Sequence, residues 1–137
     1  KETGMTEMRE YYSPTMKDRP FSMGDMKARC ENRDGAAIVA SANRVKEQSD
    51  QPHANKLMIV FSDGSPSADM YRGETAIKHT RKCVKYTESR GWNIIQIGFS
   101  GAHEYYMKRM FTNWIYINNT NTLGDQTAKI IRKVLKI

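Results

Sequence analysis

The sequence of 137 residues has few cysteines and no long apolar run, and each shortage excludes a class of protein. Cys30 and Cys83 are too few for a disulfide framework and do not form a CxxC motif. We read them as reduced structural thiols, which suits the cytoplasm. No apolar stretch approaches the roughly 20 residues of a membrane helix, and no signal peptide opens the chain. We therefore expect a cytoplasmic protein that does not enter a membrane.

Catalytic signatures are equally scarce. The chain contains no Walker A loop, no GxGxxG loop and no GxSxG nucleophile elbow. The three histidines, His53, His79 and His103, are far apart and show no metal-ligand spacing. Serine, cysteine and histidine form no recognisable triad. We therefore expect a protein that is not itself an enzyme.

The composition is that of a folded domain with a basic surface. Hydrophobic residues make up 39% of the sequence and charged residues 27%, and 137 residues suffice for one core. The net charge of +7 permits an acidic partner such as nucleic acid without requiring one. Much of this charge lies at helical spacing, which is more typical of a solvated helix face. The residues concerned are Lys78, Arg81, Lys82 and Lys85, and then Lys129, Arg132, Lys133 and Lys136.

Helical and strand-like patterns alternate after a polar, methionine-rich opening. Residues 1–33 are expected to be loop-rich, with short helical pieces near Thr6–Tyr12 and Gly24–Cys30. From residue 34 to residue 137 the alternation predicts parallel strands joined by right-handed helical crossovers. The predicted fold is a Rossmann-like three-layer α/β/α domain with a mostly parallel sheet. The expected strands are Lys56–Ser62, Asn93–Phe99 and Trp114–Ile117, and the expected helices cover residues 34 to about 48, Gly73–Arg90, His103–Met110 and a last segment that begins near Leu123–Asp125.

Stripes of period 3.6 predict the side chains that face the core. In the first helix they are Ala37, Ile38, Ser41, Ala42 and Val45. In the second they are Ala76, Ile77, Thr80, Cys83, Val84 and Thr87. Tyr105, Tyr106, Met107 and Met110 are expected to pack in the short third helix, and Thr127, Ile130, Ile131, Val134 and Leu135 in the last.

The sharpest functional feature is Asp63, which directly follows a strand that reads as buried. The carboxyl end of a parallel strand opens into the crevice where α/β sheets bind ligands, and a carboxylate there can hold a divalent cation. Ser62, Ser65 and Ser67 add hydroxyl groups nearby. Asp34 opens the preceding helix, whose start lies at the same end of a parallel sheet. The alternative is structural: Asp63 accepts backbone hydrogen bonds within its loop, and Asp34 is a helix N-cap.

The segment MIVFSDGSP, Met58–Pro66, resembles the strand-and-aspartate segment of von Willebrand factor type A (VWA) domains. It is most similar to the branch found in the cobaltochelatase T subunit and in related chelatase and nitric-oxide-reductase-activation proteins. Upstream, ENRDGAA (Glu31–Ala37) is similar to the Asn-x-Asp-Gly helix opening of that branch, and we expect Asn32 in this opening to support the site together with Ser62, Ser65 and Ser67. The resemblance covers roughly residues 10–137, because the following segments keep the order of the branch. They are Ile94–Gly98, Tyr105-Tyr106, Ile115–Ile117 and Leu123-Gly124.

The resemblance implies a metal-ion-dependent adhesion site that holds Mg²⁺ or a similar divalent cation. Such a site has an Asp-x-Ser-x-Ser motif on the first strand, a threonine or aspartate from a middle loop, and an aspartate after the fourth strand. Asp63 matches the third part and Asp34 the second. The one Asp-x-Ser-x-Ser pattern in the 137 residues, Asp63–Ser67, is the segment that matches the third part, so no separate copy of the motif is present for the first strand.

The missing motif implies a missing strand. The family sheet has about six strands, whereas the sequence predicts three, and these match the last three of the family. An apolar strand at Lys56–Ser62 without its neighbour is an exposed edge, which invites aggregation. We therefore expect this chain to be the carboxyl-terminal part of a VWA-like domain, with another segment or chain covering that edge. The cation is expected to bind only when the missing strand is supplied.

Three functions are compatible with these patterns. The resemblance implies a non-catalytic protein-interaction module, whose partner in the chelatase-like branch is a ring-forming AAA+ ATPase. The second is a nucleic-acid-binding domain that uses the basic helix faces, with affinity that falls steeply with salt. The third is a metal-dependent hydrolase built on Asp63 and Asp34. We favour the interaction module, because no general base or nucleophile stands out beside the two aspartates.

Overall fold

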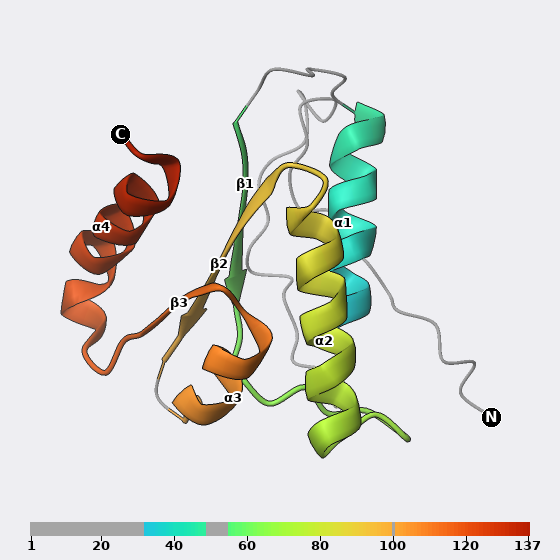
Figure 1. Ribbon diagram of the computed structural model, residues 1–137. Helices are drawn as coiled ribbons and strands as arrows, with labels where there is room; N and C mark the ends of the chain where they lie inside the picture. Colours follow the sequence, from blue (N-terminus) through green and yellow to red (C-terminus); the bar gives the residue numbers. More distant parts are fainter. Residues whose placement is uncertain (1–31, 49–54, 100) are drawn as a thin grey trace, which may run out of the picture.

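The computed structural model describes residues 32–48, 55–99 and 101–137, in which helices and strands alternate (Figure 1). Each helix and strand predicted in this part of the chain is present, and the order is confirmed. The boundaries move by one or two residues, and the helical pieces expected near Thr6–Tyr12 and Gly24–Cys30 lie outside the described residues. The elements are α1 (Asp34–Gln48), β1 (Lys56–Phe61), α2 (Gly73–Glu88), β2 (Trp92–Gly98), α3 (Glu104–Met110), β3 (Asn113–Tyr116), the short 3-10 helix η2 (Thr120–Thr122) and α4 (Leu123–Leu135).

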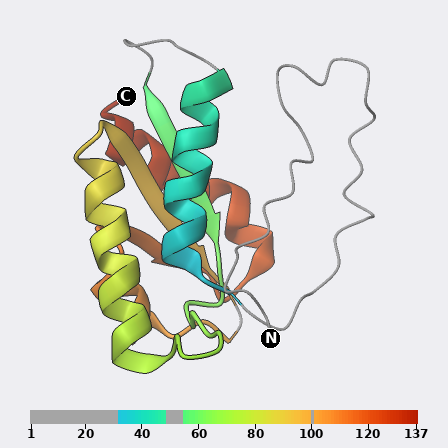
Figure 2. The same cartoon turned by 90° about the vertical axis from the view of Figure 1, so that its right-hand side faces the viewer.

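The strands form one parallel sheet in the order β1-β2-β3, so the predicted fold class is confirmed. In the register of the sheet, Ile59 of β1 lies opposite Ile95 of β2, and Ile97 of β2 lies opposite Ile115 of β3. The helices α1, α2 and α3 lie on one side of the sheet and α4 on the other, which gives the three layers (Figures 1 and 2). None of the described helices is long and apolar enough to cross a membrane.

The prediction for the inward face of α2 is largely correct. Ala76, Ile77, Thr80, Val84 and Thr87 are buried, and only Cys83 is half-exposed. The helix ends as expected before Gly91, whose φ of 86° lies in the left-handed region that glycine adopts without strain. A regular apolar stripe on a long helix therefore predicted burial well.

The same reasoning was less successful for α1 and α3. In α1, Ile38 and Ala42 are buried, but Ala37 is exposed and Val45 is 45% exposed. This helix packs chiefly against α2. Its buried stripe is therefore narrower than the stripe of a helix that lies flat on a sheet. In α3, Tyr105 is 56% exposed, which contradicts its expected role in packing, whereas Met107 and Met110 are fully buried.

The apolar side of α4 packs against β2 and β3, but it does not form the centre of the core. Three of its five predicted inward residues, Ile130, Ile131 and Val134, contribute to a cluster with Ile95, Ile97 and Ile117, but none of the residues of α4 is fully buried. Asp125 lies in the first turn, as predicted for the positive end of a helix.

The strand β1 differs from the expectation that it is buried. Among the described residues it pairs only with β2, so one side of the strand is a free edge. Lys56 to Val60 are all half-buried, and Phe61 is 57% exposed. This arrangement agrees with the exposed edge that the missing neighbour predicts.

Candidate functional site

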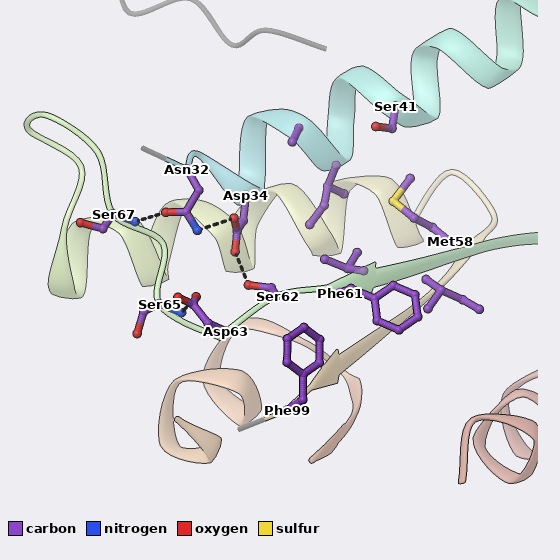
Figure 3. Close-up of a pocket in the computed structure, with 14 residues that line it drawn as sticks. Asn32, Asp34, Ser41, Met58, Phe61, Ser62, Asp63, Ser65, Ser67 and Phe99 are labelled. Atoms are coloured by element: carbon purple, nitrogen blue, oxygen red, sulfur yellow. Dashed lines mark hydrogen bonds between the residues drawn. The ribbon is translucent and has the colours of Figure 1, made fainter. Parts of the chain in front are cut away.

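The polar residues predicted for the site meet at the carboxyl end of β1, where α1 begins (Figure 3). A groove of about 920 Å³ runs from this point between α1 and the free edge of β1. Its polar end is lined by Asn32, Asp34, Ser62, Asp63, Ser65 and Ser67, which are all the site residues that the sequence predicted. The rest of the lining is Ala37, Ile38, Ser41, Met58, Ile59, Val60, Phe61 and Phe99.

Asp34 occupies the floor of the polar end. One carboxylate oxygen accepts a hydrogen bond from the Ser62 hydroxyl at 3.1 Å, and the other accepts one from the Asn32 side-chain amide at 3.1 Å (Figure 3). Ser62 in turn accepts a hydrogen bond from the backbone N–H of Gly64 at 3.1 Å. The carboxylate of Asp34 is thus oriented by side chains from the end of β1 and from its own helix start and does not act as a simple N-cap.

Burial is the main reason why the pKa of Asp34 lies above its ordinary value. The hydrogen bond from Ser62 opposes this increase, the nearby charge of Asp63 adds to it, and the hydrogen bond from Asn32 opposes it. The carboxyl group is therefore held where its charge is costly. A cation in the groove would relieve this cost, because it favours the ionised form.

Asp63 lies at the mouth of the groove and is exposed. One of its carboxylate oxygens accepts a hydrogen bond from the backbone N–H of Ser65 at 2.9 Å, as the structural alternative for this residue predicts. A carboxylate has about four lone-pair positions, so this bond leaves most of its capacity free. Gly64 takes a φ of 76° between them, a conformation that few other residues adopt.

Asn32 joins the start of α1 to the loop that follows Asp63. Its side-chain oxygen accepts a hydrogen bond from the Ser67 backbone N–H at 2.6 Å, and its own backbone N–H donates to the Ser67 carbonyl at 2.9 Å. Together with the bond to Asp34, these contacts make Asn32 a bridge between both halves of the site. The sequence had suggested only a supporting role for it.

Sequence reasoning missed two residues that fix the same loop. Arg33 donates a hydrogen bond to the Asp69 carbonyl at 2.9 Å, and its guanidinium lies 5.3 Å from the centre of the Tyr71 ring. Tyr71 is buried, and its hydroxyl shares hydrogen bonds of 2.9 Å with His79 and with Thr80 of α2. The position of Arg33 next to Asp34 in the sequence could have identified it as part of the site. Nothing in the sequence distinguishes Tyr71 from other tyrosines in loops.

The residues at the polar end are of the types that bind a divalent cation, but they are too few to complete its coordination. Carboxylate and hydroxyl oxygens are the ligands that Mg²⁺ prefers in proteins. Asp34 and Asp63 line the same end of the groove, and the charge of Asp63 raises the pKa of Asp34. However, no group of three or more His, Cys, Asp or Glu side chains suited to a metal occurs in residues 32–48, 55–99 and 101–137. Asp34 and Asp63 would therefore supply only part of the ligands that such a cation needs.

Comparison with known proteins identifies a matching family. A model of the family described as "Cobalamin biosynthesis protein CobT VWA domain" matches residues 9–136. The uncharacterized protein YojO of Bacillus subtilis (strain 168) is 30% identical over 111 residues, which cover 77% of this chain. The chain spans only 17% of the length of that relative. No solved structure matches the chain significantly.

Proposed function

Because the chain belongs to the family of CobT VWA domains, we propose that it is a non-catalytic module that binds a partner protein through a divalent cation. The observation that supports this most is the convergence of Asp34, Asp63 and Ser62 at one end of an open groove. Asp34 and Asp63 hold the cation, with Mg²⁺ as the expected ion. The cation supplies a coordination position that a carboxylate of the partner completes.

The other residues of the site prepare Asp34 for this task. Ser62 and Asn32 fix the orientation of its carboxylate, and Asn32 also ties the loop after Asp63 to the start of α1. Such supporting hydrogen bonds orient the direct ligands and tune the affinity of metal sites. Ser65 and Ser67 line the mouth of the groove and can hold ordered water around the ion.

The remaining ligands come from a strand that pairs with the free edge of β1. The groove follows that edge and ends at the two carboxylates, so a strand lying there carries its carboxyl end to the cation. We expect the strand to carry the Asp-x-Ser-x-Ser motif of the family's first strand, which is separate from Asp63–Ser67. The partner is expected to be a ring-forming AAA+ ATPase, with this protein as its adaptor.

The cation is tested by thermal unfolding of the full-length protein with and without Mg²⁺ at about 5–10 mM, a concentration above the Kd of a weak site. We expect Mg²⁺ to raise the Tm of the native protein and to have no effect on the Asp63→Ala variant. Asp125→Ala is the matched control, because Asp125 is also exposed but lies on α4, away from the groove. An identical Tm with Mg²⁺ and with EDTA would show that no cation binds.

The partner is tested by co-purification of the full-length protein with the ring ATPase encoded nearest to it. We expect a complex that EDTA dissolves and that Asp34→Ala weakens about tenfold or more, as the loss of one metal ligand predicts. A complex that resists both EDTA and Asp34→Ala contradicts a cation-mediated interface.

Nucleic-acid binding is a second proposal, which the exposed basic residues support. Lys129, Arg132, Lys133 and Lys136 are exposed along one side of α4. The second basic stripe lies on α2, across the sheet from α4, so the two stripes do not form one surface (Figure 1). A salt titration with duplex and single-stranded DNA tests this function, because the logarithm of the affinity falls linearly with that of the salt concentration. The absence of binding at low salt rejects it.

The metal-dependent hydrolase remains the weakest of the three proposals. It requires a general base or nucleophile beside Asp63 and Asp34, and the residues that line the groove offer only the serine hydroxyls. Turnover of a phosphoester that Asp63→Ala abolishes would establish it.

A further inference from the structure

The loop after Asp63 carries an unusual turn at its tip. Ala68 and Tyr71 exchange two backbone hydrogen bonds, of 2.9 and 3.0 Å, so Asp69 and Met70 form a tight two-residue turn between them. Met70 has a φ of 53°, in the left-handed region that non-glycine residues rarely adopt. A turn with a positive φ at this position ordinarily carries glycine or asparagine there.

The side chain of Met70 is 92% exposed, more than any other large apolar side chain in the described part of the chain. It therefore gains almost nothing from packing in return for the strain of its backbone. A single exposed apolar side chain is ordinary on a protein surface. An exposed methionine in a conformation that asparagine or glycine would adopt more easily is unusual, because neither the stability of the fold nor the solubility of the protein favours it.

The turn is also held firmly in place. Arg33 donates to the Asp69 carbonyl, the buried Tyr71 is anchored to α2, and Asn32 bonds to Ser67 on the same loop. These contacts connect the turn directly to the residues that orient Asp34. Met70 thus stands on a hydrogen-bonded turn at the same end of the sheet as the carboxylates, so that binding does not have to order the loop itself.

We propose that Met70 is an apolar anchor, which inserts into an apolar pocket of the partner protein next to the acidic side chain that the cation binds. This inference rests on the proposed function, because it assigns a second contact to the same interface. Unbranched, polarizable methionine adapts to pockets of irregular shape and is common at protein-binding surfaces. The backbone strain persists because the side chain acts outside the fold.

Two variants separate the anchor from the turn. In Met70→Asn the side chain is polar and short, and it tolerates the left-handed conformation. In Met70→Leu the apolar volume is kept. In the full-length protein we expect Met70→Asn to raise the Tm by about 2–3 °C while it weakens partner binding about tenfold or more. Met70→Leu is expected to retain binding, and Ile137→Asn, at an apolar residue that is 77% exposed, is the control.

Binding to a partner that has not been identified is measured with a photo-crosslinking amino acid at Arg72, which is exposed on the same loop. We expect one discrete adduct in the source cells that Met70→Asn diminishes and that Met70→Leu and Ile137→Asn leave unchanged. No adduct, or an adduct that Met70→Asn leaves unchanged, overturns the anchor.

The same measurement separates the anchor from the cation. If the adduct depends on Met70 but not on Asp34 or Mg²⁺, the anchor stands and the cation-mediated function fails. If it depends on Asp34 but not on Met70, the cation-mediated function stands and the anchor fails.

Discussion

The strands β1 and β2 are both strongly apolar, yet their surroundings differ sharply. In β2, Ile94, Ile95 and Ile97 have no exposed surface, because strands flank β2 on both sides and helices cover both faces. In β1, an even more continuous apolar run is half-buried throughout and ends in the exposed Phe61. A strand as apolar as β1 is typical of a position buried on both faces. Among the described residues, β1 is therefore an apolar strand that is open along one edge.

The matched pair Ile95 and Ile59 tests this difference most directly, because the two residues are neighbours in the register of the sheet. In the 137-residue chain we expect Ile95→Ala to reduce the free energy of unfolding by about 4 kcal/mol and Ile59→Ala by about 1–2 kcal/mol. Urea unfolding measures both values. In the full-length protein the loss for Ile59→Ala should approach that for Ile95→Ala. Equal losses in the short chain would contradict the edge position of β1.

Gly98 tests how tightly β2 ends. A Cβ atom at this position would lie 2.6 Å from the Met107 sulfur and 2.9 Å from the Ala102 Cβ. We therefore expect Gly98→Ala to reduce the free energy of unfolding by about 2 kcal/mol. Gly124→Ala on α4 is the control, since nothing lies within 4 Å of its added Cβ, and it should gain about 0.5 kcal/mol. A neutral Gly98→Ala would mean that the end of the Met107 side chain moves aside at no cost.

Gln96 is the polar exception inside β2. It is fully buried, and neither its side-chain oxygen nor its nitrogen has a hydrogen-bond partner among the described residues. Gln96→Met keeps the volume and removes the unsatisfied groups, so we expect it to raise the free energy of unfolding by about 1–2 kcal/mol. Gln126→Met provides the contrast, because the Gln126 amide donates to Thr122 at 2.8 Å. Destabilisation by Gln96→Met would reveal a bridging water or another partner.

Asp34, beside the end of β1, tests the balance between stability and function. Its pKa is raised by burial, so its contribution favours the folded state at low pH and is lost as the pH rises through the folded-state pKa. Asp34→Asn should therefore resemble the native chain at about pH 4 and become more stable, by about 1 kcal/mol, at about pH 7 without Mg²⁺. Tm values across this pH range measure the difference. A constant difference at every pH would show that the Asp34 charge does not cause it.

The order and type of the elements were predictable from local patterns alone. Ile77, Thr80 and Val84 recur at the helical period, and the apolar run of β2 is too short for a helix, so each element followed from its own residues. The convergence of Asp34 and Asp63 was predictable as well, because parallel strands and the helices between them bring strand ends and helix starts to one edge. The remaining site residues were predictable because they stand next to these two aspartates in the sequence; they are Asn32, Ser62, Ser65 and Ser67.

The contacts that hold the site required the tertiary structure. The exposure of Tyr105 and Val45 depends on which elements pack against α1 and α3, and the apolar pattern of a single helix does not show this. The hydrogen bonds from Ser62 to Asp34 and from Arg33 to the Asp69 carbonyl join residues that are distant in sequence. The left-handed backbone of Met70 depends on a loop conformation that such contacts impose. The sequence by itself determined the elements, their parallel order and the residues of the site, because period and turn chemistry are local. Only the tertiary structure decided how the acidic end of β1 is held, because burial and strain arise when distant segments meet.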